Sequence, residues 1–154
     1  VLKDNTFYTG DLGYLDKDNF LHITGRKKNV IVTANGKNIF PEELETYLDR
    51  NDFIKESVVC GVFNEKKNDY DLVALIVPDD EKFAEYYHDE YTDADVAERV
   101  KKAVAEVNNT VQNYKHIDMF VIRKEEFEKN TSKKIKRFVI KDTLKDALKD
   151  SHRS

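Results

Sequence analysis

The sequence predicts a small α+β fold, in which helices pack on a few-stranded sheet and a β-hairpin precedes them. Two observations predict this class. Short β-branched, apolar runs bounded by polar turns recur along the chain, and apolar residues at helical spacing fill several of the segments between them. The apolar runs are not joined by regularly repeated crossovers, so the expected order of elements is β-β-α-β-β-α-β-α.

The first two expected strands form a hairpin. Residues 7–15 and 19–24 flank a polar turn at residues 16–19. Within the first strand, the sequence Thr-Gly-Asp-Leu-Gly at residues 9–13 places two glycines around a carboxylate. Glycine inside a strand marks either a bulge or a close approach of the backbone to a ligand. Taken alone, these residues favour a bulge with a surface aspartate at Asp11.

The stretch from residue 25 to residue 45 holds the most organised local signal of the chain. Residues 29–33 are β-branched and favour a strand. Residues 34–38, Ala-Asn-Gly-Lys-Asn, favour a turn because Asn and Gly tolerate positive φ. Pro41 pre-sets φ for the start of a helix, and two glutamates follow where the helix dipole favours anions. The stretch therefore predicts a presented loop, which many ligands would suit.

Two further apolar runs predict a pair of neighbouring strands. These are residues 57–63 and 70–77, and residues 72–77 are apolar almost throughout. A central strand covered on both faces is therefore expected at residues 72–77. Residues 79–91 are acidic and rich in tyrosine, and we expect a loop with a helical turn and a solvated face there.

The last third of the chain predicts two helices and a strand. Thr92, with Asp95 three residues later, is typical of a helix N-cap, and the helix is expected to end near residues 108–109. Residues 116–123 then predict a strand, and residues 137–148 predict a final amphipathic helix.

Composition limits the class of protein. The chain has 154 residues, of which 40% are hydrophobic and 36% charged, as in one polar globular domain with at most an appendage. It shows no transmembrane run and no signal peptide, and its single cysteine, Cys60, lies among valines as an expected buried thiol. We therefore expect a cytoplasmic protein. The net charge of -4 weighs against a nucleic-acid partner. The start at Val1, without methionine, predicts a piece of a longer protein.

The search for catalytic motifs finds few specific signals. The four histidines lack zinc-ligand spacing, so no metal site is expected in this chain. No nucleophile elbow, dinucleotide fingerprint or phosphate-binding loop motif is present in the sequence. Residues 131–137, Thr-Ser-Lys-Lys-Ile-Lys-Arg, form a dense cationic segment. It is either a solvated turn or a set of cations offered to phosphate or carboxylate.

Three of these motifs are specific when they are taken together and in order. Residues 9–13, 25–45 and 131–137 resemble the last three signature motifs of AMP-forming acyl-CoA synthetases, which belong to the adenylate-forming superfamily. The sequence of the middle motif is most similar to that of bacterial long-chain fatty-acid members. The resemblance covers essentially the whole chain. It implies that residues 1–27 are the terminal hairpin of an absent N-terminal domain and that residues 28–154 are a C-terminal lid domain.

The resemblance also implies a reaction. Members of the family use ATP and Mg²⁺ to convert a carboxylic acid, here a long-chain fatty acid, to an acyl-adenylate, and then pass the acyl group to coenzyme A. The Mg²⁺ ligands and the acyl pocket lie in the family's N-terminal domain, so that domain is the implied partner and this piece alone is expected to be inactive. Two alternatives stay open. One is an adenylation domain that delivers to a carrier-protein pantetheine, and the other is a stand-alone binding module.

The resemblance assigns expected roles to individual residues. Asp11 resembles the carboxylate that accepts hydrogen bonds from the ribose hydroxyls of ATP. Arg26 resembles the arginine that reaches the ribose and phosphate region, and Lys28 stands at the family's hinge position. Lys134 resembles the catalytic lysine before Ile-x-Arg. Relatives often have glycine where this chain has Lys133. Because the two lysines are adjacent, the assignment of Lys134 depends on register, and Lys133 is the fallback.

The glycine-containing turn receives a role in the same way. Asn35, Gly36 and Lys37 resemble the loop that lines the tunnel for the pantetheine arm of coenzyme A. A glycine there lets the backbone approach a narrow substrate arm.

Overall fold

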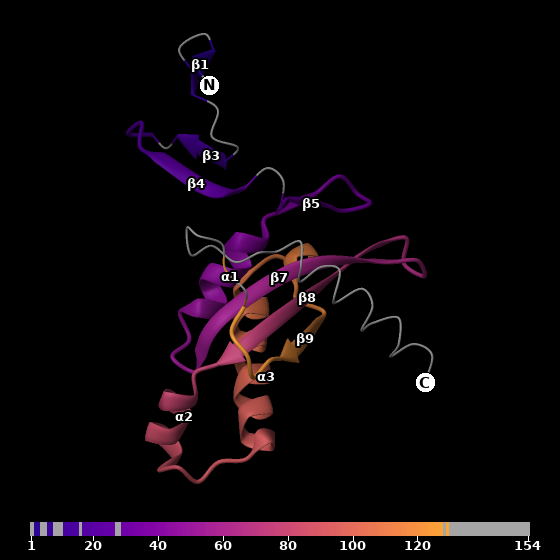
Figure 1. The fold of residues 1–154 in the computed structure, drawn as a ribbon. Helices are drawn as coiled ribbons and strands as arrows, with labels where there is room; N and C mark the ends of the chain where they lie inside the picture. Colours follow the sequence, from indigo (N-terminus) through magenta and orange to yellow (C-terminus); the bar gives the residue numbers. More distant parts are fainter. Residues whose placement is uncertain are drawn as a thin grey trace.

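The computed structural model describes residues 2–3, 6–7, 11–15, 17–26, 29–127 and 129, and in the strands before residue 27 only the backbone pairing is described. In this part of the chain a three-stranded sheet is covered on one face by two helices, and short hairpins lead into it (Figure 1). The predicted α+β class is confirmed.

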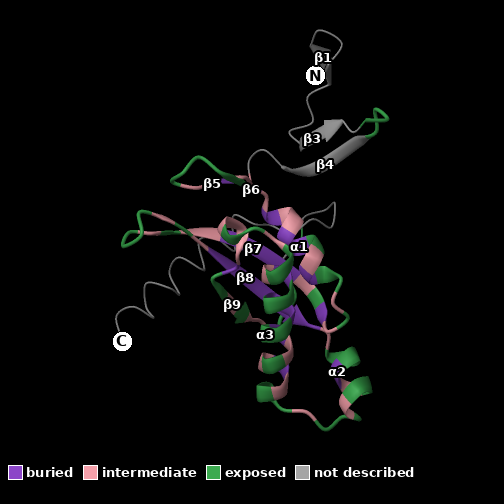
Figure 2. Cartoon of the chain, turned by 180° about the vertical axis from the view of Figure 1, so that it is seen from behind, coloured by how far each residue is buried: buried purple, intermediate pink, exposed green. Residues whose placement is uncertain are grey.

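The sheet is built on one long hairpin. Strands β7 (Ile54–Asn64) and β8 (Asp69–Pro78) are antiparallel, and β9 (Met119–Ile122) adds parallel to β8, so the strand order is β7-β8-β9. β8 is thus the central strand, and every residue from 72 to 78 is buried (Figure 2). This confirms the prediction of a central strand with two covered faces, because β8 has a strand on each edge and contributes residues to a hydrophobic cluster on each face.

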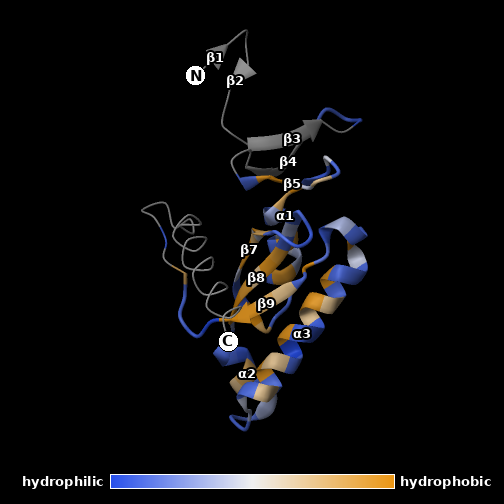
Figure 3. Ribbon diagram, turned by 90° about the vertical axis from the view of Figure 1, so that its right-hand side faces the viewer, coloured by the Kyte–Doolittle hydropathy of each residue, from blue (hydrophilic) through white to orange (hydrophobic). Residues whose placement is uncertain are grey.

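One face of the sheet carries the main hydrophobic core. Helices α1 (Pro41–Asp49) and α3 (Asp93–Thr110) both pack there. The strands of the sheet are mostly hydrophobic, whereas hydrophobic and hydrophilic residues alternate along α3 (Figure 3). This is the pattern of helices that bury one stripe and expose the other. The core includes Leu44 and Leu48 from α1, Val96, Val100, Val104 and Val107 from α3, and Val59, Leu72, Ala74 and Ile76 from the sheet.

The opposite face of the sheet has a smaller core. Phe127, from the segment after β9, packs there against alternate residues of β7 and β8. Cys60 belongs to this cluster and is 2% exposed, so the predicted burial of the thiol is confirmed. The other members are Val58, Val73, Leu75 and Val77.

Residues 79–91 correct the sequence prediction, because they contain the helix α2 (Asp80–Tyr87) rather than a loop with a single turn. The Asp79 side chain accepts a hydrogen bond from the Lys82 backbone N–H at 3.3 Å and caps the helix. Phe83 is fully buried, with its ring 4.8 Å from that of Phe53. One buried aromatic side chain therefore fixes a helix that its acidic composition alone does not predict.

The start of α3 is as predicted. Thr92 and Asp95 form a capping box, in which the Thr92 N–H donates to the Asp95 carboxylate at 2.8 Å and the Asp95 N–H donates to the Thr92 hydroxyl at 3.4 Å. The helix ends at Thr110, slightly beyond the expected end, and a 3-10 turn, η2 (Asn113–Lys115), leads to β9.

Short strand pairs precede the sheet. β1 (Leu2–Lys3) pairs with β2 (Thr6–Phe7), and β3 (Asp11–Leu15) pairs with β4 (Leu21–Arg26) in the predicted hairpin. The register shifts between Leu12 and Gly13, so the expected bulge is present.

The helix predicted at residues 137–148 lies outside the described residues.

A third hairpin, β5 (Ile31–Val32) with β6 (Asn38–Ile39), rests on β7. The strand predicted at residues 29–33 is therefore shorter than expected. Ile31 is buried at 5% exposure, and a Cβ placed on Gly61 would lie 3.0 Å from the Ile31 Cδ1 atom. Gly61 is thus required for close approach, because any side chain there would occupy the space that Ile31 fills.

We predict that Gly61→Val lowers the free energy of unfolding by about 1–3 kcal/mol, the usual cost of overpacking. Urea unfolding measures this change. In an Ile31→Ala background, which empties the space beside Gly61, the same substitution should cost less. Strictly additive costs of the two changes would show that the contact between these residues does not hold the hairpin on the sheet.

Candidate functional site

The candidate site is the glycine loop, residues 33–38, which joins β5 to β6. Hydrogen bonds within the loop close it: the Thr33 N–H donates to the Lys37 carbonyl at 2.8 Å, and the Gly36 N–H donates to the Thr33 carbonyl at 2.9 Å. The Lys37 N–H also donates to the Thr33 hydroxyl at 3.0 Å. Gly36 has a φ of +76°, in the region that favours glycine. The predicted turn is confirmed.

The turn of the glycine loop is open to the outside. Asn35, Gly36 and Lys37 are all exposed, and a Cβ placed on Gly36 would meet no atom within 4 Å. The fold therefore requires glycine at this position for its backbone conformation and not for space. An exposed loop backbone without a side chain at its turn offers a surface that a narrow ligand arm can approach closely.

Two lysines flank an aromatic ring beside the loop. The Lys37 Nζ atom lies 5.5 Å from the centre of the Tyr114 ring, and the Lys115 Nζ atom lies 5.7 Å from the same ring. Lys115 also forms an ion pair with Glu43 at 3.2 Å, which ties η2 to the first turn of α1. Sequence reasoning missed Tyr114 and Lys115, because no local motif marks them and only the tertiary fold brings them to the loop.

The entry to the hairpin is tied to the same helix. The Asn29 side-chain amide donates to the Glu42 carboxylate at 2.8 Å, which joins the segment just before β5 to the start of α1. The expected hinge, Lys28, immediately precedes this contact in the sequence but lies outside the described residues. The first residue after the expected hinge is thus fixed to the helix.

The other predicted site residues are described in part or not at all. The antiparallel register of β3 and β4 pairs Asp11 directly with Arg26, so the two expected nucleotide-contacting residues are cross-strand neighbours along the backbone. Lys133 and Lys134 lie outside the described residues. Asn35, Gly36 and Lys37 are thus consecutive residues of one exposed loop, and Asp11 is paired with Arg26. The functional roles of all these residues stay predictions.

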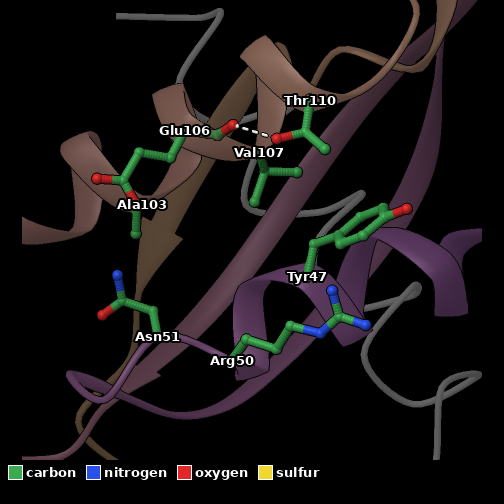
Figure 4. Close-up of a pocket in the computed structure, with 7 residues that line it drawn as sticks. All are labelled: Tyr47, Arg50, Asn51, Ala103, Glu106, Val107 and Thr110. Atoms are coloured by element: carbon green, nitrogen blue, oxygen red, sulfur yellow. Dashed lines mark hydrogen bonds between the residues drawn. The ribbon is translucent and has the colours of Figure 1, made fainter.

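A groove of about 310 Å³ lies between the C-terminal halves of α1 and α3 (Figure 4). Two of its polar side chains contact residues close by in the sequence: the Thr110 hydroxyl donates to the Glu106 carbonyl at 2.9 Å, and the Arg50 guanidinium lies 5.2 Å from the centre of the Tyr47 ring. The lining residues are Tyr47, Arg50, Asn51, Ala103, Glu106, Val107 and Thr110. None of them is a predicted site residue.

The described residues contain neither a metal-binding cluster nor a membrane-spanning helix. No group of three or more His, Cys, Asp or Glu side chains is arranged there to hold a metal ion. No helix in the same part of the chain has both the length and the apolar character needed to cross a membrane.

Solved structures share this fold. The ATP-bound crystal structure of MatB from Rhodopseudomonas palustris is similar over 95% of this chain and 26% of its own, with a TM-score of 0.68 and 26% identity. The adenylation domain of a carboxylate reductase from Mycobacterium chelonae matches all of this chain and 24% of its own, with a TM-score of 0.76 and 21% identity. The fold is therefore that of a domain of adenylate-forming enzymes.

The sequence comparison gives the family. Residues 28–152 match the profile described as AMP-binding enzyme C-terminal domain, and the chain belongs to this family. A long-chain-fatty-acid–CoA ligase, FadD15 of Mycobacterium tuberculosis, is 36% identical over 156 aligned residues, which cover 91% of this chain and 25% of the ligase. A long-chain-fatty-acid–CoA ligase of Bacillus subtilis is 47% identical over 62 residues, which cover 40% of this chain and 11% of the ligase. The chain thus spans at most about a quarter of these curated relatives.

We predict that Gly36→Ala lowers the free energy of unfolding by about 1–2 kcal/mol, because alanine resists the left-handed conformation and no clash adds to this cost. Gly36→Asn is the matched control and should cost clearly less, since asparagine tolerates positive φ better than alanine. Urea unfolding compares the two variants. Equal costs, or a larger cost for asparagine, would contradict the requirement for a positive φ at this position.

Proposed function

We propose that this chain is the C-terminal part of an AMP-forming acyl-CoA ligase, which converts a long-chain fatty acid, ATP and coenzyme A to acyl-CoA, AMP and pyrophosphate. Residues 28–154 would be the lid domain, and residues 1–27 the last hairpin of the N-terminal domain with which it works. One observation carries the proposal: in a chain of this family, an exposed loop presents Gly36 at its turn with an open backbone surface. We place the reaction in the cytoplasm, where a single cysteine stays reduced.

In the first half-reaction the fatty-acid carboxylate attacks the α-phosphorus of ATP, and pyrophosphate leaves. Two anions must approach each other, so a cation between them stabilises the transition state. Lys134 is the proposed source of that charge, because an ammonium is a compact point charge on a flexible stem. Asp11 would accept hydrogen bonds from the ribose hydroxyls, and Arg26 would reach the ribose and phosphate region. Mg²⁺ would be held by the N-terminal domain and would neutralise phosphate charge.

In the second half-reaction the thiol of coenzyme A attacks the acyl carbon of the acyl-adenylate, and AMP leaves. The lid would first turn about Lys28, whose backbone dihedrals absorb the rotation. That movement would bring Asn35, Gly36 and Lys37 to the pantetheine arm. The fixed conformation of the glycine loop supports this role, because a loop that is already ordered loses little entropy when an arm binds against it.

The proposed acid is favoured by the extent of the similarity. The relative that covers 91% of this chain is named a long-chain-fatty-acid–CoA ligase. Two relatives named for other acids match shorter stretches: an indoleacetate–CoA ligase of Aromatoleum aromaticum matches 51% of the chain, and a 2-succinylbenzoate–CoA ligase of Geobacillus kaustophilus matches 42%. A carrier-protein pantetheine presents the same thiol arm, so the choice of acceptor is tested by supplying both acceptors to the same enzyme.

We predict that Lys134→Ala in the full-length protein slows acyl-adenylate formation at least about 100-fold, because it removes a charge that acts on the developing negative charge of the transition state. Pyrophosphate exchange measures this step. Thioester formation from supplied acyl-adenylate should be largely retained, since that step occurs after the lid has turned.

The matched control is Lys133→Ala, which should leave both half-reactions close to normal. If Lys133→Ala instead of Lys134→Ala blocked adenylation, the catalytic lysine would be the neighbouring residue. An equal loss of both half-reactions in Lys134→Ala would contradict the proposal that this lysine acts in adenylation and the glycine loop in thioester formation.

A further inference from the structure

The glycine loop is held by a residue that is distant in the sequence. The Ala34 N–H donates to the Asp69 carboxylate oxygen Oδ1 at 3.1 Å, and the Tyr70 N–H donates to the same oxygen at 2.8 Å. Asp69 belongs to the hairpin tip, residues 64–69, which turns β7 into β8. The tip and the glycine loop lie side by side and project in the same direction (Figures 1 and 2).

This contact complements the bonds that the loop makes within itself. The N–H groups of Thr33, Gly36 and Lys37 donate to acceptors inside the loop, whereas the Ala34 N–H donates to Asp69. The base of the hairpin is anchored by the buried side chains of β5 and β6, but apolar packing there is non-directional. The Asp69 carboxylate adds a directional, charge-assisted bond next to the exposed turn.

The hairpin tip is itself braced, so it provides a firm support for Asp69. The Asn64 side-chain oxygen accepts from the N–H groups of Lys66 and Lys67 at 3.0 and 3.4 Å, and the Asn64 amide donates to Asp71 at 2.7 Å. Asn64 and Asp69 are also the last residues paired between β7 and β8. These bonds hold the turn that delivers Asp69.

A second brace connects the tip to the parallel edge of the sheet. The Lys67 ammonium pairs with Asp71 at 2.5 Å and lies 3.9 Å from Asp118, whose carboxylate accepts from the Leu72 N–H at 2.8 Å. Burial opposes ionisation of Asp71, but the hydrogen bonds from Lys67 and Asn64 outweigh it and hold the pKa of this carboxyl below its ordinary value. The Lys67–Asp71 pair is therefore ionised at neutral pH.

We propose that Asp69 is a positioning residue for acyl transfer to the thiol. It fixes the backbone of the glycine loop through the Ala34 N–H, so that Gly36 is correctly placed to contact the pantetheine arm. The inference rests on the role proposed above for the glycine loop. It assigns to the hairpin tip a task that neither its sequence nor the family match specifies. Small errors in placing a substrate-contacting group are costly in rate, so a rigid support for the loop has a kinetic purpose.

The test compares three variants of the full-length protein. Asp69→Ala removes the acceptor, Asp69→Asn keeps an oxygen at the same place without the charge, and Lys66→Ala is the control at an exposed position of the same tip. We expect Asp69→Ala to slow thioester formation from supplied acyl-adenylate about 10-fold or more and to leave pyrophosphate exchange within about twofold. Asp69→Asn should recover most of the rate, and Lys66→Ala should match the parent in both steps.

Amide hydrogen exchange of the peptide that contains Ala34 gives a readout that is independent of activity. Asp69→Ala should accelerate exchange there, and Asp69→Asn should largely restore protection. Unchanged exchange, or an equal loss of both half-reactions, would overturn the positioning role. Asp69→Ala could accelerate exchange and leave thioester formation normal, while Gly36→Ala slowed thioester formation. In that case the role of Asp69 would be wrong, and the role of the glycine loop would stand. If neither variant affected thioester formation, the proposed function of the loop would fail as well.

Discussion

The packing of Ile31 against Gly61 is the contact on which the presentation of the glycine loop depends. It lets the β5–β6 hairpin lie directly on β7, so that Ile31 and Ile39 join the core formed by α1, α3 and the sheet. The loop between them then leaves the core with both of its ends fixed. Without this close approach the hairpin would be a two-stranded ribbon with two residues per strand, which is not stable by itself in water.

Polar contacts add to this packing the direction that apolar burial lacks. Asn29 ties the entry of the hairpin to α1, Asp69 ties the turn of the glycine loop to the hairpin tip, and Lys115 ties η2 to α1. The bonds join residues 13, 35 and 72 positions apart, and each fixes an orientation because hydrogen bonds weaken steeply when they are misaligned. The loop is thus tied to the sheet and to α1, which suits a domain that is proposed to move as one piece between two half-reactions.

The sequence predicted the elements whose determinants are local. The apolar run of β8, the proline that starts α1 and the Thr92–Asp95 capping box each depend on a few neighbouring residues, and each is present. The helix α2 was missed because Phe83 is held by Phe53, a contact that composition does not show. Tyr114, Lys115 and Asp69 were missed for the same reason, since only the tertiary fold places them beside the glycine loop. The turn at Gly36 was predicted from its residue types, whereas its chemical role came from resemblance to a family.

In the proposed reaction, the exposed backbone at Gly36 contacts the pantetheine arm after the lid has turned. A crystal structure of the full-length protein with coenzyme A and a non-reactive acyl-adenylate analogue tests it most directly. We expect the pantetheine arm to pass in van der Waals contact with the Gly36 backbone, while the Ala34 N–H stays bonded to Asp69. A complex in which the arm is bound elsewhere and the glycine loop faces solvent would contradict it.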